Sequence, residues 1–189
     1  MNKYFFVLNE KIKKIILIIF VLLILGFYSI AFPLILIFSF YLLLFRKINI
    51  VIKDIRLAES NILLSPISGT FLRSITKDSE TLLVFKMNFY NNYGIYLPLN
   101  AEITDFSEGV IHFHNKLNQN YSISTRGYFF MNKAKVLVSA GDKGVVGGLL
   151  GHFPFGGKVY LEIPSHCDVI MKPGERVYSS QTILAKLKD

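Results

Sequence analysis

Residues 150–164 read LGHFPFGGKVYLEIP, a glycine-rich turn that runs directly into an alternating segment. The adjacent glycines Gly156 and Gly157 permit positive φ and a close approach of backbone to backbone. Polar and apolar residues then alternate over residues 158–163, which predicts a half-buried strand. Similar short runs recur from about residue 50, for example at 62–64, 81–87 and 109–114, between Gly, Pro, Asn and Ser turns. This texture predicts a compact, mainly β domain, either a barrel or a sandwich.

The N-terminal part of the chain is strongly apolar, and no charged residue lies between Lys14 and Arg46. The run is longer than the roughly 20 residues of one membrane span and short for two. Pro33 is expected to break or kink a helix there, and basic residues flank both ends of the run. By the positive-inside rule both ends face the cytoplasm, which favours a helical hairpin over a single long, kinked span. We therefore expect a membrane hairpin with basic flanks over residues 1–48. A β domain over residues 49–189 would face the cytoplasm at the inner (cytoplasmic) membrane.

The composition agrees with a membrane segment joined to one domain. The chain has 189 residues, of which 52% are hydrophobic, and its mean hydropathy is +0.43. Its formal net charge of +8 favours anionic membrane lipids as partners. No helix-turn-helix, zinc-finger or RNA-binding motif supports nucleic acid as the partner. The basic residues beside the apolar run are candidates for contacts with lipid phosphates, although a topology signal explains them equally well: Arg46, Lys47, Lys53 and Arg56.

Five short motifs follow one another along the chain: Leu44-Phe45-Arg46, the turn at 65–69, the strand at 94–103 with Gly109, the turn Phe155-Gly156-Gly157, and the tail at 172–177. In order and spacing, these motifs resemble those of the small bacterial phosphatidylserine decarboxylases. The resemblance runs over nearly the whole length, although Lys47-Ile48 replaces the aspartate-proline pair that follows the family's hairpin. It implies a β domain with lipoyl-like hybrid elements, because the segments at 64–70 and 169–177 each read strand, proline, glycine turn and strand.

Three positions that are catalytic in that family differ in this chain. The resemblance places Ser68 where the family has an aspartate, Glu102 where it has a histidine, and Gly157 where it has the serine of the cleavage turn. In the family, self-processing resembles a serine-protease triad acting on its own chain, and the serine becomes a pyruvoyl group that serves as the electron sink for decarboxylation. Glycine has neither a hydroxyl nor a β-carbon, so we expect no pyruvoyl cofactor and no catalytic residue. The chain is expected to be a pseudoenzyme that binds phospholipid or a protein partner.

Other chemistry-bearing residues have simpler explanations than a reactive site. Glu102, beside Asp105 and Glu108, is a candidate for a carboxylate cluster, and His112 and His114 share one face of a predicted strand. Without a third ligand at zinc-like spacing, a solvated surface explains them better than a metal site. His152, beside the glycine-rich turn, is expected to make a structural polar contact.

Two other functions stay open at this point. One is a divergent, active phosphatidylserine decarboxylase in phosphatidylethanolamine synthesis. The other is a membrane adaptor with a lipoyl-like barrel. The oligomeric state and the identity of any protein partner are also left open.

Overall fold

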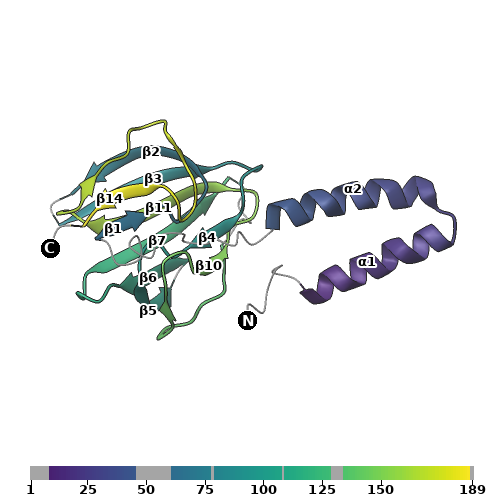
Figure 1. Cartoon of the computed structure of the whole chain (residues 1–189), viewed down its shortest axis with the longest axis horizontal. Coiled ribbons are helices and arrows are strands. Elements are labelled where there is room, and N and C mark those ends of the chain that lie inside the picture. Colours follow the sequence, from purple (N-terminus) through teal and green to yellow (C-terminus); the bar gives the residue numbers. More distant parts are fainter. Residues whose placement is uncertain (1–8, 46–60, 78, 108, 129–133, 188–189) are drawn as a thin grey trace. The chain divides into compact units, whose positions relative to one another are not determined.

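The computed structural model describes residues 9–45, 61–77, 79–107, 109–128 and 134–187 of the chain (Figure 1). Contacts divide the chain into two compact units, Met1–Asn49 and Ile50–Asp189. In the described residues, the first unit is helical and the second is built from strands.

Two helices, α1 (Asn9–Ile24) and α2 (Tyr28–Phe45), make up the described part of the first unit. Gly26 lies in the turn between them with a φ of 77°, a conformation that residues with a side chain rarely adopt. The sequence predicts that Pro33 breaks or kinks a helix in the apolar run. The prediction of a break at this residue is wrong. α2 continues through Pro33, which lies only five residues after the helix begins. Proline here removes one backbone hydrogen bond without ending the helix, and the break lies at Gly26 instead.

The described side chains of the two helices are mostly apolar and exposed to solvent, among them Leu17, Phe20, Ile24, Leu36 and Ile37. Within residues 14–41, for which side chains are described, Ile19 and Ala31 are buried. No helix in the described part of the chain combines the length and the apolarity needed to cross a bilayer. The structure therefore gives two helices, and a hydrophobic membrane hairpin stays a prediction.

An eight-stranded antiparallel sheet organises the second unit (Figure 1). Its strands, in spatial order, are β13 (Arg176–Val177), β2 (Gly69–Thr76), β3 (Glu80–Met87), β11 (Gly157–Pro164), β7 (Asn120–Gly127), β6 (Val110–His114), β5 (Ala101–Ser107) and β9 (Lys143–Gly144). β11 pairs over its whole length with β3 and over six residues with β7. The strand that follows the glycine-rich turn is thus central to the sheet.

Two three-stranded sheets accompany the large one. The first has the order β1 (Ile62–Leu64), β14 (Ile183–Lys186) and β12 (Asp168–Val169). The second has the order β4 (Gly94–Tyr96), β10 (Leu149–His152) and β8 (Lys135–Val136). The prediction of a mainly β domain is confirmed. The barrel alternative is wrong, because the sheets stay open and the outermost strands of the large sheet, β13 and β9, have only two residues each.

One face of the large sheet forms the hydrophobic core. On β11 the buried residues Val159, Leu161 and Ile163 alternate with the exposed Lys158 and Glu162. Neighbouring strands add aromatic pairs to the same buried face: the rings of Phe71 and Phe85 lie 5.5 Å apart, and those of Phe113 and Tyr121 stack at 5.6 Å. Each such buried side chain stabilises the fold by about 1.5–3 kcal/mol, which fixes the register and leaves the alternate residues facing outward.

The two proline-glycine segments noted in the sequence lie side by side. β13 pairs with the start of β2, with Arg176 opposite Thr70 and Val177 opposite Gly69. The Ser180 N–H also donates to the carbonyl oxygen of Ser65 at 2.7 Å. The two segments therefore lie against each other at the β13–β2 edge of the large sheet, which does not close.

Candidate functional site

The turn before β11 holds three successive residues with positive φ. Phe155 has a φ of 61°, Gly156 of 73° and Gly157 of 149°. The Gly156 N–H donates to the carbonyl oxygen of Phe153 at 3.4 Å, and β11 begins at Gly157. The turn therefore feeds the chain into the centre of the sheet in a conformation that glycine adopts more easily than any other residue.

Gly157 also has no room for a side chain. A β-carbon built there would meet the carbonyl oxygen of Arg126 at less than any normal contact distance. It would also lie 2.7 Å from Cζ of Phe153 and 2.9 Å from Cα of Gly127. Real β-carbons essentially never approach heavy atoms within 3.0 Å, so the backbone of β7 would have to move. At Gly156 the obstacle is the carbonyl oxygen of Met87 on β3. The backbone around Gly157 therefore leaves no room for a serine side chain at this position.

Ser68, which the resemblance places at the family's aspartate, connects the two proline-glycine segments. Its Oγ lies 3.1 Å from Oγ of Ser179 and accepts the Ser179 N–H at 3.1 Å. The Asn91 side chain donates to the carbonyl oxygen of Ser68 at 3.0 Å. Ser68 directly precedes β2, and it lies at the same end of the sheet as Gly157 with β3 between them. Its contacts are those of a structural crosslink.

Glu102, placed at the family's histidine, lies at the other end of the sheet. It is opposite His114 on β6, and its Oε2 is 3.5 Å from Nζ of Lys143 in a solvent-exposed ion pair. His114 is in turn opposite Asn120, the first residue of β7, whereas Gly157 is opposite Gly127, the last residue of β7. At about 3.3 Å per residue, these two levels are roughly 23 Å apart along the strand. The structure therefore brings Ser68 to the Gly157 end and does not bring Glu102 there.

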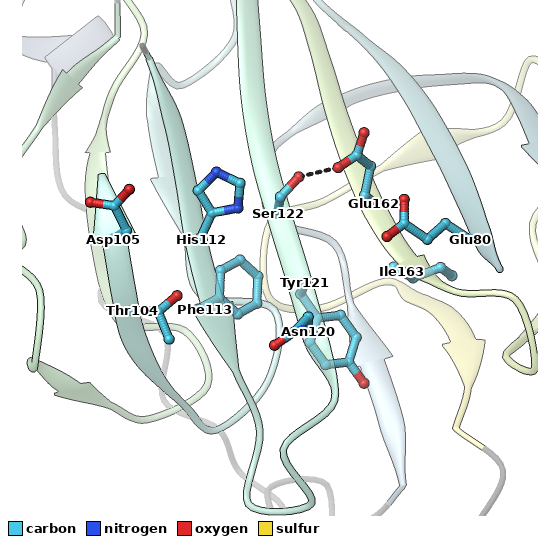
Figure 2. A pocket seen from close by; sticks show the side chains of 10 residues that line it. All are labelled: Glu80, Thr104, Asp105, His112, Phe113, Asn120, Tyr121, Ser122, Glu162 and Ile163. Carbon is cyan, nitrogen blue, oxygen red and sulfur yellow. Dashed lines mark hydrogen bonds between the residues drawn. The ribbon is translucent and has the colours of Figure 1, made fainter. Parts of the chain in front are cut away.

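A row of polar side chains crosses the outer face of the large sheet (Figure 2). Asp105 on β5 is opposite His112 on β6, His112 is opposite Ser122 on β7, and Ser122 is opposite Glu162 on β11. With Glu80 they contribute to the lining of a pocket of about 480 Å³. Directly opposed side chains in a sheet are close enough to interact, so this row brings carboxylates, an imidazole and a hydroxyl together.

The hydrogen bonds of this row do not form a catalytic triad. Oγ of Ser122 donates to Oε2 of Glu162 at 2.6 Å. No hydrogen bond joins His112 to Asp105 or to Ser122 among the residues that the structure describes. A serine activated for attack needs its base within hydrogen-bonding reach. In the same described residues, no group of three His, Cys, Asp or Glu side chains is arranged to hold a metal ion.

His152 is buried at the end of β10, where it is opposite Gly94 of β4 and Lys135 of β8. Burial, and secondly the positive charge of Lys135, lower the pKa of His152 from 6.5 to about 4. The imidazole is therefore neutral at pH 7 and is part of the packed interior. The candidate lipid contacts predicted beside the apolar run lie outside the described residues: Arg46, Lys47, Lys53 and Arg56.

The comparisons with known proteins agree with the resemblance over part of the chain. No protein-family model matches the chain. Over 96 residues the chain is similar in sequence to a curated protein, with 26% identity. That relative, from Methanococcoides burtonii, is named "Putative archaetidylserine decarboxylase proenzyme". The match covers 51% of this chain and 46% of the relative, so the chain spans about half the length of the curated relative it matches.

Sequence reasoning missed Ser122 and Glu162 as partners of Asp105 and His112. The alternation of residues placed Lys158 and Glu162 on the exposed face of their strand. This alternation does not predict the order of the strands in the sheet. That order decides which exposed residues lie opposite one another.

Proposed function

We propose that this chain is a relative of the serine-phospholipid decarboxylases that stays in one piece, carries no pyruvoyl group and acts by binding. The observation that carries the proposal is Gly157, at the position where the resemblance expects the self-cleaving serine. A pyruvoyl group forms from the β-carbon and hydroxyl of that serine, and glycine has neither. The crowding of this position by Arg126 and Gly127 supports a lasting role for glycine rather than a replaceable one.

The other two substituted positions support the same proposal. An acid, a histidine and a serine must contact one another for a triad to work. Ser68 is engaged with Ser179, and Glu102 lies near Lys143 at the far end of the sheet. We find no second set of residues in the described part of the chain that supplies the same chemistry at Gly157.

We further propose that the chain works at an anionic lipid surface, at the cytoplasmic face of the cytoplasmic membrane. The net charge of +8 supports attraction to anionic headgroups. The exposed aliphatic and aromatic side chains of α1 and α2 support contact with acyl chains. The relative's name concerns a lipid substrate, which makes a lipid the class of ligand we expect.

Measurement of the intact mass of the purified full-length chain tests the proposal. An uncleaved chain of 21.6 kDa, with no carbon dioxide released from phosphatidylserine or archaetidylserine, is the expected result. Two fragments split between Gly156 and Gly157, the C-terminal one with a carbonyl-blocked N-terminus, would overturn it. Release of carbon dioxide by the intact chain would instead favour the divergent active decarboxylase.

A further inference from the structure

A row of cations crosses the outer face of the large sheet at the Gly157 end. Arg126 on β7 is opposite Lys158 on β11, and Lys158 is opposite Lys86 on β3. The row continues through Thr70 on β2 to Arg176 on β13. All four charged residues are exposed. Like charges placed directly opposite each other destabilise a sheet, so packing of the domain does not explain the row.

Exposed aromatic side chains border this basic row. β3, β7 and β13 end at this edge of the sheet, and β11 begins there. Each of these strands is followed or preceded by an aromatic residue that is about half exposed or more: Phe89 (62%), Tyr90 (61%), Tyr128 (49%), Phe155 (55%) and Tyr178 (55%). We call these five rings at one edge of the sheet the aromatic rim. Aromatic side chains favour the boundary between water and lipid.

We propose that the edge formed by this basic row and aromatic rim docks on an anionic lipid bilayer, with the rings at headgroup level and the cations against lipid phosphates. Basic residues are attracted to anionic membrane surfaces, and aromatic side chains favour the membrane interface. Phe89 and Phe155 have no polar atom on their rings, so contact with acyl chains suits them better than contact with water. Nucleic acid would match the cations and the rings but would leave the apolar rings of Phe89 and Phe155 without an acyl-chain environment. The proposal shares its ligand class with the proposed function, but it depends on the sheet's own residues.

A tryptophan reporter tests the orientation directly, because the chain contains no natural tryptophan. Full-length Phe89→Trp and, as a second reporter, Tyr90→Trp would be mixed with vesicles of brominated phosphatidylcholine, with and without phosphatidylglycerol. Leu117→Trp is the matched control, since Leu117 is 63% exposed in the β6–β7 loop at the opposite end of the sheet. We expect bromine to quench both edge reporters strongly and the Leu117→Trp reporter little, with phosphatidylglycerol increasing the difference.

A pair of double variants tests the cations at equal net charge. Lys86→Gln with Lys158→Gln removes two charges from the basic row, whereas Lys77→Gln with Lys116→Gln removes two exposed charges from the other end of the sheet. We follow the quenching of the Phe89→Trp reporter as vesicles are added. Loss of each lysine of the row should raise the vesicle concentration at half-saturation by about fivefold. The control pair should leave it nearly unchanged.

Three outcomes would overturn the proposal. One is vesicle-bound protein in which neither edge reporter is quenched. Another is equal quenching at the edge and at Leu117→Trp, and a third is an edge signal that responds to an oligonucleotide and not to vesicles. None of these affects the intact mass of the chain, so failure of this proposal is distinguishable from failure of the proposed function.

Discussion

Replacement of Gly157 by alanine separates the two reasons why a side chain is excluded there. The φ of 149° costs a residue with a β-carbon about 1–3 kcal/mol. The contacts of the new β-carbon with Arg126 O and with Gly127 Cα force a shift of β7, for which overpacking typically costs a further 1–3 kcal/mol. Together we expect Gly157→Ala to lower the free energy of unfolding by roughly 2–6 kcal/mol, a large part of the 5–15 kcal/mol typical of a folded protein.

Gly141 supplies the matched control for the conformational part of this cost. Its φ is 86°, but a β-carbon there would have no heavy atom within 4 Å. Gly141→Ala should therefore cost only about 1–2 kcal/mol, the ordinary penalty of a left-handed residue. The difference between the two variants isolates the crowding at Gly157.

Urea unfolding of the full-length chain, followed by the circular dichroism of its strands, measures both variants. We expect the midpoint of Gly157→Ala to fall well below that of Gly141→Ala, and Gly157→Ser to behave like Gly157→Ala without any self-cleavage. If the midpoints of Gly157→Ala and Gly141→Ala coincide, the site is not crowded, and the steric part of our reasoning is refuted.

Three further variants test individual contacts. Ser68→Ala removes the crosslink to Ser179 and should lower the free energy of unfolding by about 1 kcal/mol, measured by the same urea titration. Ser122→Ala removes the 2.6 Å hydrogen bond to Glu162 and should lower the free energy of unfolding by about 0.5–1.5 kcal/mol. Ser124→Ala, on the same strand, serves as the control. The pKa of His152 is about 4 in the folded chain and near 6.5 in the unfolded chain. As the pH falls below 6.5, the imidazole is therefore protonated in the unfolded chain before it is protonated in the folded chain. Stability should therefore decrease between pH 6.5 and 4 by at most about 3 kcal/mol, and His152→Gln should flatten that slope. An unchanged slope in His152→Gln would show that other groups carry the pH dependence.

The sequence predicted individual strands well because alternation is a local signal. The segment predicted at 158–163 is β11, and that at 81–87 is β3, each within a residue or two of its observed bounds. The hydrophobic residues at every second position are enough to define such a strand, since one face of it must be buried. The break between the helices was misplaced because Pro33 and Gly26 are both helix breakers, and sequence alone does not show which of them ends a helix.

The arrangement of the strands was not predictable in the same way. Asp105 and Glu162 are 57 residues apart in the chain, yet they belong to one row, because β6 and β7 lie between their strands. Register between distant strands depends on pairing that no local pattern encodes. For the same reason the resemblance grouped Ser68, Glu102 and Gly157 by their roles in a family, whereas the register separates Glu102 from the other two by the length of β7.

The backbone on both sides of Gly157 leaves no room for a side chain at this position. β11 has neighbours on both sides, and its first residue is opposite Met87 and Gly127 at once. A glycine there lets both neighbours approach closely, and once they have done so a serine no longer fits without moving β7. Under the proposed function, Gly157→Ser alone would consequently not produce self-cleavage, because the backbone at Arg126 would also have to move. Close packing at Gly157 leaves the cations and aromatic rings of this edge exposed, and this is why we propose that the edge binds lipid.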